Sequence, residues 1–174
     1  MAIIFPSGEH LKITKDPLGV GGEGKVFRVA NTGKTGIIAK IYSKLPDRER
    51  QDKLKAMVSI DNSVLMDACA WPIDTLTDTN SGNICGFTMH EVIESEPLHH
   101  FYSPSWRKQN QPNASWDNLL QLAANLAAVF SVVHDLGIVV GDVNPNSLRV
   151  RKNGRVVLID SDSFQLSHKG TLYR

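Results

Sequence analysis

A cluster of glycines, LGVGGEGK at residues 18–25, lies between two segments that alternate apolar and polar residues in the manner of β-strands, HLKIT (10–14) and KVFRVA (25–30). Gly19, Gly21 and Gly24 have the spacing G-x-G-x-x-G, and Val26 follows. A dinucleotide-binding βαβ unit has the same glycine spacing, but there the glycines open a helix. The segment therefore predicts a β-hairpin, whose turn is either a flexible tip or a loop that folds over phosphates.

The next predicted strand, GIIAKIY (36–42), carries Lys40 among apolar residues. A lysine in such a strand costs free energy unless its ammonium group meets an anion. On the strand next to the glycine hairpin, the ammonium could reach phosphates held by that turn. The alternative is an outward-facing lysine on a two-sided strand.

Three acidic residues stand at the ends of apolar runs in the second half of the chain. Asp142 lies in the polar turn GDVNPNS, and Asp160 and Asp162 end the next apolar run. Carboxylates at such places are turn formers, metal ligands, or a catalytic base with its metal partner. Between them, SLRV and RVVLI are joined by RKNG, which predicts a β-hairpin with an Asn-Gly turn.

The chain changes character near its middle. The first part is rich in strand signals, with NICGFTMHEVI (83–93) as a further strand and one predicted helix, PDRERQDKLKAMVSI (46–60). The second part holds the longest helical pattern, 115–137, with Ser115 as N-cap and Gly137 as its end. Residues 94–113 are predicted to be an irregular connection. The layout is α+β in two lobes, 1–93 and 94–174.

Composition excludes several classes of protein. The net charge is +1, which gives no electrostatic reason to expect nucleic acid or a membrane surface as partner. Apolar runs are far shorter than the ~18 residues of a membrane span, and no secretory signal is visible, so we expect a cytoplasmic protein. Cys69 and Cys85 show no metal spacing and are expected to be buried, reduced thiols.

Gly19-x-Gly21-x-x-Gly24-x-Val26, Lys40, Asp142 and Asp160 occur in the order that protein kinases use. From about residue 18 to 166 the chain resembles the eukaryotic-type protein kinase fold. More narrowly, ACAWPIDTL and GDVNPNSLRV…VVLIDSDSFQL resemble a bacterial branch of protein-kinase-like proteins, some with helix-hairpin-helix segments. The resemblance implies a β-rich N-lobe and the first part of a helical C-lobe, truncated after the equivalent of the D-F-G motif.

This resemblance implies ATP and Mg²⁺ as ligands. The implied nucleotide-binding positions are the glycine hairpin, the lysine, an acid that pairs with it and the strand leading into the hinge: Gly19, Val20, Gly21, Gly22, Gly24, Val26, Lys40, Glu49, Met89, His90 and Val92. Met89 would be the gatekeeper, and the backbone of His90 and Val92 would meet the purine. A solvent-facing Glu49 and an ordinary core strand at 83–93 are the alternatives.

In the same way, Asp142 is implied as the catalytic base and Asp160 as the Mg²⁺ ligand, with Lys40 on the phosphates. Ser147 stands where kinases place a metal-binding Asn, and a shifted Asn146 is the alternative. Asp162 either assists the metal or is a solvated turn residue, and the second reading is preferred.

Several residues depart from the kinase pattern. Val140-Gly141 replace the His-Arg before the catalytic Asp, Asn144 replaces a Lys, and Ser161 replaces the Phe of D-F-G. The preferred hypothesis is a bacterial serine/threonine protein kinase acting on a protein substrate. The alternative is a pseudokinase, a nucleotide-binding regulator or scaffold with a protein partner. A small-molecule kinase ranks last, because those enzymes lack so regular a glycine loop.

Overall fold

The computed structural model describes residues 2–30 and 36–174. The chain forms two compact units. Of the described residues, the first comprises 2–30, 36–61 and 71–91 with Tyr173, and the second comprises 62–70 and 92–172 with Arg174. The change of unit after residue 91 falls close to the boundary predicted at 93/94. The sequence did not predict that 62–70 would join the second unit.

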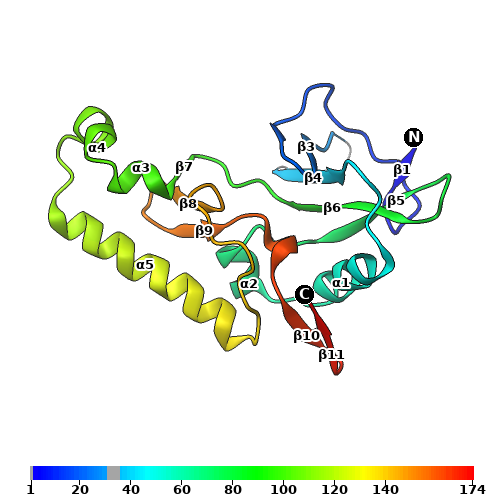
Figure 1. Cartoon of the computed structure of the whole chain (residues 1–174). Coiled ribbons are helices and arrows are strands. Elements are labelled where there is room, and N and C mark those ends of the chain that lie inside the picture. Colours follow the sequence, from blue (N-terminus) through cyan, green and yellow to red (C-terminus); the bar gives the residue numbers. More distant parts are fainter. Residues whose placement is uncertain (1, 31–35) are drawn as a thin grey trace. The chain divides into compact units, whose positions relative to one another are not determined.

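A six-stranded antiparallel sheet forms the first unit, in the order β1-β5-β6-β4-β3-β2 (Figure 1). Its strands are β1 (Ile3–Ile4), β2 (Gly19–Val20), β3 (Gly24–Arg28), β4 (Ile37–Tyr42), β5 (Asp74–Asp78) and β6 (Ile84–His90). HLKIT, predicted as a strand, makes only isolated bridges, from His10 to Ile4 and from Ile13 to Val29. Regular pairing needs a continuous partner edge, which the alternation of a single segment does not reveal.

Helix α1 (Arg48–Val58) packs against β5 in the first unit. It begins two residues after the predicted start, because Asp47 is the cap: its carboxylate accepts a hydrogen bond from the Arg50 N–H at 2.9 Å. The buried Trp71 ring donates from Nε1 to the Met57 carbonyl oxygen at 2.9 Å. Gln51 accepts from the Ile84 N–H at 3.0 Å, which fixes the helix to β6.

The second unit combines helices with two small sheets. Its helices are α2 (Ser63–Ala68), α3 (Leu98–Tyr102), α4 (Pro104–Asn110), α5 (Trp116–Asp135) and the 3₁₀ turn η1 (Ser161–Ser163). The strands are β7 (Ser95–Pro97), β8 (Leu148–Arg151) and β9 (Val156–Leu158), paired in the order β7-β8-β9, and the hairpin of β10 (Leu166–His168) and β11 (Thr171–Tyr173). Helix α5 packs against α2 and β9, and the Ala70 N–H donates to the Leu158 carbonyl oxygen at 2.8 Å.

Helix α5 has the ends that the sequence predicted. Ser115 donates from its backbone N–H and its hydroxyl to the Asn118 side-chain oxygen, at 2.8 and 3.1 Å. Gly137 has φ of 71°, the left-handed conformation of a helix stop. By length and composition, α5 is the one helix among the described residues that would pass as a membrane span, and only 6% of its most apolar window is buried. The sequence analysis looked for long uninterrupted apolar runs. It therefore did not find this helix, because polar residues interrupt its apolar pattern.

The irregular connection predicted for 94–113 is wrong. This segment contains β7, α3 and α4. Helix α4 begins with Pro104 in its first turn and with Ser103 as cap, whose hydroxyl accepts from the Trp106 N–H at 3.5 Å. Helices of five and seven residues are too short to display a hydrophobic period, so the sequence pattern did not reveal them.

Both thiols are free and buried, as predicted. Burial raises the pKa of Cys69 to about 12. Burial, and then the Asp78 carboxylate, raise the pKa of Cys85 to about 11.

We therefore predict that neither thiol of the folded protein reacts with a thiol-specific reagent at about pH 8, because the thiolate is the reactive form. Both should react once the chain is unfolded in urea. Because both pKa values are raised by folding, their contribution to stability is complete below about pH 8.5 and declines as the pH rises further. Modification of a native thiol at the rate of free cysteine would contradict this placement.

Candidate functional site

The glycine-rich segment forms a hairpin between β2 and β3, with Gly19 opposite Val26 and Val20 opposite Lys25. The Gly21 N–H donates to the Gly24 carbonyl oxygen at 2.9 Å and closes the turn. A strand follows the glycines, which excludes the helix-opening arrangement of dinucleotide-binding folds.

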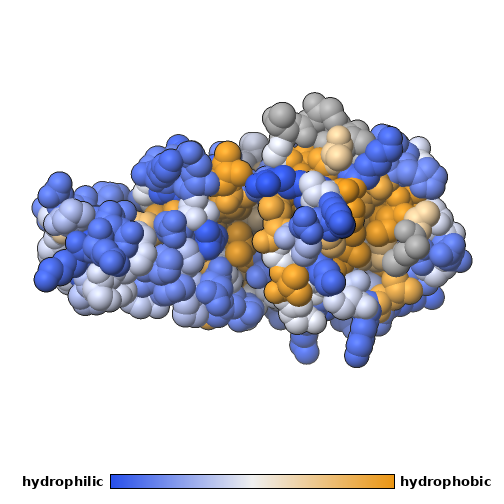
Figure 2. Space-filling model, turned by 90° about the horizontal axis from the view of Figure 1, so that it is seen from above, coloured by the Kyte–Doolittle hydropathy of each residue, from blue (hydrophilic) through white to orange (hydrophobic). Residues whose placement is uncertain are grey.

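The glycines of this hairpin differ in what surrounds them. A Cβ added at Gly19 or Gly22 would meet no atom within 4 Å, so packing within the chain does not require glycine there. A Cβ at Gly24 would collide with the Ile41 carbonyl, so Gly24 is needed for β3 to approach β4. Val20 is 69% exposed, and Figure 2 shows apolar residues exposed over the sheet of the first unit. At Gly19 and Gly22 the turn thus offers backbone that no side chain of the described residues covers.

An ion pair fastens the tip of the hairpin to α1. Arg50 donates from its two terminal nitrogens to the two oxygens of Glu23, at 3.0 and 2.5 Å. The Arg50 guanidinium also lies over the Tyr42 ring, 4.8 Å from its centroid. This bidentate pair was not predicted, because nothing in the sequence relates two residues so far apart.

Lys40 stands in the middle of β4, opposite Val26 on β3 and Phe87 on β6. Its side chain is only 7% exposed, which excludes the outward-facing alternative. The ammonium nitrogen lies 5.8 Å from the ring centroid of Tyr42 and 6.0 Å from that of Phe87. Aromatic faces stabilise a cation at such distances, so the ammonium group is held in a defined position.

The structure does not bring Glu49 to Lys40. Glu49 is exposed in the first turn of α1 and makes no ion pair with any described residue. The face of the helix that packs inward carries Lys53, which is 3% exposed, together with Leu54 and Met57. The sequence left a solvent-facing Glu49 as the alternative, and the phase of the helix turns this side chain to solvent.

The predicted purine-binding segment is the end of β6 and the residues after it. Met89 is buried and lies opposite Ile38, and His90 is exposed. Glu91 accepts two hydrogen bonds from Arg28, at 2.7 and 3.1 Å, which raises the pKa of that guanidinium. Val92 is half-buried and begins the next part of the second unit. The adenine role of these residues stays a prediction.

In the second unit, two segments pair next to the predicted catalytic loop. Val139 and Gln165 exchange two backbone hydrogen bonds, both of 2.8 Å. Two residues on, a Cβ at Gly141 would collide with the Ser163 carbonyl, so glycine is required for this close approach. This pairing places Asp142 directly beside the turn that begins at Asp160.

The loop around Asp142 is held by its own hydrogen bonds. Asn144 donates from its amide nitrogen to Asp142 Oδ2 at 2.9 Å. The Asn144 Oδ1 atom accepts from the backbone N–H groups of Asn146 and Ser147, at 2.9 and 3.1 Å. Asp142 is exposed, so one of its oxygens is oriented by Asn144 while the other remains available to a ligand.

Ser147, the other predicted metal ligand, lies buried within the loop of Asp142. Its side chain is 1% exposed. The hydroxyl contacts the carbonyl oxygens of Asp142 and Asn144, at 3.0 and 2.9 Å, and accepts from the Asn144 N–H at 3.0 Å. These contacts use the hydroxyl to close the loop, and the metal role of Ser147 stays a prediction. Asn146 is exposed.

Asp160 adopts the left-handed conformation, with φ of 57° and ψ of 38°. Non-glycine residues rarely adopt it, and they cluster at functional sites when they do. The Ser163 hydroxyl and N–H both contact the Asp160 carbonyl oxygen, at 2.8 and 3.1 Å. Asp160 itself is exposed.

Asp162, expected to be a solvated turn residue, is 2% exposed. The 3₁₀ turn folds this side chain inward, and it also buries Ser161, whose hydroxyl donates to the Ala70 carbonyl oxygen at 2.7 Å. A turn of three residues is too short to show a hydrophobic period, so the sequence did not indicate which way these side chains point.

Among residues 2–30 and 36–174, no three His, Cys, Asp or Glu side chains converge to form a ready metal site. This is compatible with Mg²⁺ held by one or two carboxylates and by substrate phosphates. Asp160, exposed and fixed by its backbone, has the donor chemistry for such a ligand.

The glycine hairpin, the buried lysine and the paired aspartate loops define the class: the chain has a protein-kinase-like fold. No family model matches it. Over 170 residues it is 43% identical to "Protein kinase YegI" of Escherichia coli (strain K12), covering 98% of this chain and 26% of that protein. The protein of the same name from Escherichia coli O157:H7 is 45% identical over 156 residues, with 90% and 24% covered.

A solved structure described as "ROP18 kinase domain in complex with AMP-PNP and sucrose" matches the fold with a TM-score of 0.62 at 16% identity. The match covers 99% of this chain and 62% of that one. The chain spans about a quarter of the length of the curated relatives it matches.

We predict that Gly141→Ala destabilises the protein by about 1–3 kcal/mol, because the added methyl group must displace the Ser163 backbone. Urea unfolding measures the loss. Gly22→Ala is the matched control, since its methyl group would meet no atom within 4 Å. Equal midpoints for the two variants would show that the close approach of these segments does not limit stability.

Proposed function

We propose that this chain carries the nucleotide-binding and catalytic residues of a protein kinase, and that the protein transfers the γ-phosphate of ATP to serine or threonine hydroxyl groups of a protein substrate. The observation that carries the proposal is the position of Lys40, a buried ammonium group on the strand next to an open glycine hairpin. The names of the two relatives and the fold of the solved kinase domain support it.

In this proposal the glycine hairpin and Lys40 hold the phosphates of ATP. The exposed backbone of Gly19, Gly21 and Gly22 lets a phosphate approach without meeting a side chain. Lys40 supplies a positive charge fixed against Tyr42, so little reorganisation is needed when an anion binds.

Asp142 acts as the base that orients the substrate hydroxyl and accepts its proton. Asn144 holds one carboxylate oxygen and aims the other outward. Asp160 is the proposed Mg²⁺ ligand; the ion, when bound, neutralises charge on the phosphate oxygens. Gly141 and Ser163 keep the two aspartates on adjacent segments.

A second candidate is a pseudokinase that binds nucleotide and a protein partner without transfer. Ser147 favours it, because its hydroxyl is engaged in the loop instead of standing free as a second metal ligand. Asn144, which stands where kinases have a lysine, offers a neutral contact to a phosphate instead of a charged one.

We predict that Lys40→Ala weakens Mg-ATP binding at least tenfold, since a charge-assisted contact contributes about 1.5–3 kcal/mol. Isothermal calorimetry measures the affinity. Lys25→Ala is the matched control, because it removes the same charge from the exposed side of the adjacent strand. Equal affinity of the two variants and the unchanged protein would remove Lys40 from the binding site.

We predict that Asp142→Asn lowers kcat by about 10²–10⁴-fold in the full-length protein and leaves ATP affinity nearly unchanged, because the amide cannot accept the proton. Incorporation of γ-phosphate into protein is the measurement, and Asp61→Asn, an exposed loop residue, is the control. If the unchanged protein binds ATP but transfers no phosphate, the pseudokinase alternative holds.

A further inference from the structure

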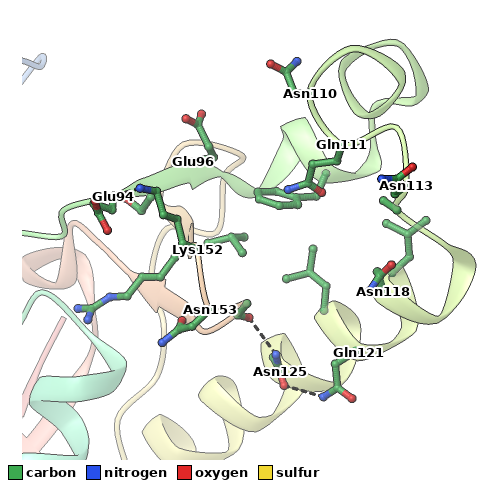
Figure 3. Close-up of a pocket in the computed structure, with 18 of the residues that line it drawn as sticks. Glu94, Glu96, Asn110, Gln111, Asn113, Asn118, Gln121, Asn125, Lys152 and Asn153 are labelled. Atoms are coloured by element: carbon green, nitrogen blue, oxygen red, sulfur yellow. Dashed lines mark hydrogen bonds and ion pairs between the residues drawn. The ribbon is translucent and has the colours of Figure 1, made fainter.

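A hollow of about 850 Å³ lies within the second unit, away from Asp142 and Asp160. Its sides are the β7 strand, the turn between β8 and β9, the connection from α4 to α5, and the first half of α5 (Figure 3). Binding sites for ligands commonly occupy about 300–1,000 Å³. The proposed kinase chemistry uses no residue of this hollow, which we call the amide groove.

Side-chain carboxamides dominate the polar lining. Seven of them line the groove: Asn110, Gln111, Asn113, Asn118, Gln121, Asn125 and Asn153. Figure 3 shows them on elements distant in the sequence, from the α4–α5 connection to the β8–β9 turn. Each carboxamide offers both hydrogen-bond donors and an acceptor without a charge.

Some of these carboxamides hydrogen-bond to one another or to the backbone and hold the sides of the groove together. Asn125 donates to the Gly154 carbonyl oxygen at 2.9 Å, and Gln121 donates to Asn125 Oδ1 at 3.0 Å. These bonds join α5 to the β8–β9 turn and fix the Gln121 side chain. The side chains of Gln111 and Asn113 make no hydrogen bond with the described residues, so their donors and acceptors are available to a ligand.

The lining carries two acidic and two basic side chains, Glu94, Glu96, Arg151 and Lys152. Lys152 lies 3.0 Å from Glu94, and Glu96 lies 3.1 Å from the His100 ring nitrogen. The lining therefore presents no strong field of one sign, and an acidic or basic ligand gains little from it. A neutral polar ligand matches the carboxamides better.

Apolar side chains lie between the amides. Phe101, Leu119, Leu122 and Val150 line the groove. An extended peptide displays side chains on alternate sides and, at each residue, one N–H and one C=O. Carboxamides pair with both backbone groups, while apolar surface accepts the side chains that point inward.

We propose that the amide groove binds an uncharged, extended peptide segment of a protein partner, with aliphatic side chains seated on Leu119, Leu122 and Val150. The lining favours a peptide over an oligosaccharide, because three of its four large apolar side chains are aliphatic and only Phe101 offers a flat ring. The inference needs neither ATP nor phosphoryl transfer, so it stands or falls independently of the proposed function.

The test begins with selection of a phage-displayed library of random dodecapeptides on the protein. The proposal expects enriched peptides that are uncharged and alternate polar and aliphatic residues. One such peptide, synthesised with a fluorophore, is titrated with the protein and followed by fluorescence anisotropy. The double variant Gln111→Ala, Asn113→Ala should bind about tenfold more weakly, and Gln109→Ala, an exposed amide of α4 outside the groove, should bind unchanged.

Because Gln111 and Asn113 are exposed, their loss does not threaten folding. A Leu122→Asp variant, checked for native melting, should abolish binding, and Leu120→Asp, on an exposed part of the same helix, should not. Failure to enrich any peptide overturns the proposal. So does enrichment of strongly charged peptides, or binding that the groove variants leave intact. Binding of neutral glycans on an array, with no peptide bound, assigns the groove to a sugar instead.

Discussion

A lysine ammonium buried within a β-sheet is the constraint on which the first unit depends. A buried charge costs several kcal/mol unless the groups around it compensate for the lost water. The rings of Tyr42 and Phe87 lie beside the Lys40 nitrogen. Glycines on both neighbouring strands let the backbones approach closely: a Cβ at Gly86 would collide with the Lys40 carbonyl, and one at Gly24 with that of Ile41. Close strand packing and two aromatic rings thus hold the Lys40 side chain in a defined place.

In the second unit, two carboxylates are held in place while both remain exposed to solvent. Backbone pairing of Val139 with Gln165 and the contact of Gly141 with Ser163 set the two segments side by side. Asp142 is then oriented by Asn144, and Asp160 by its own left-handed backbone. Exposed carboxylates on a rigid backbone suit a reaction in which positioning matters more than basicity. The departures from the kinase pattern have structural uses here, since Gly141 and Ser147 both serve the packing of this loop.

The sequence predicted the features that depend on local pattern. The glycine hairpin, β4 with its lysine, the two ends of α5 and the Asn-Gly hairpin were all correct because each has a strong short-range signal. Whether a polar side chain points into the core or toward solvent was not predictable in this way. Glu49 and Lys53 lie on one helix, and only the packing shows which of them is turned inward. Asp162 and Ser147 are polar residues of short turns, and their burial depends on distant segments. The amide groove is lined by residues between 94 and 154, and no local sequence pattern predicts that they lie together.

Hydrogen–deuterium exchange with and without Mg-ATP tests the central claim most directly, because it reports on both units without a variant. The account predicts slower exchange of the backbone amides in 19–26 and in the loops of Asp142 and Asp160, with the amides around 111–113 unchanged. Identical exchange in both loops and in the glycine hairpin at saturating nucleotide would contradict the claim that these residues form a kinase-type nucleotide site.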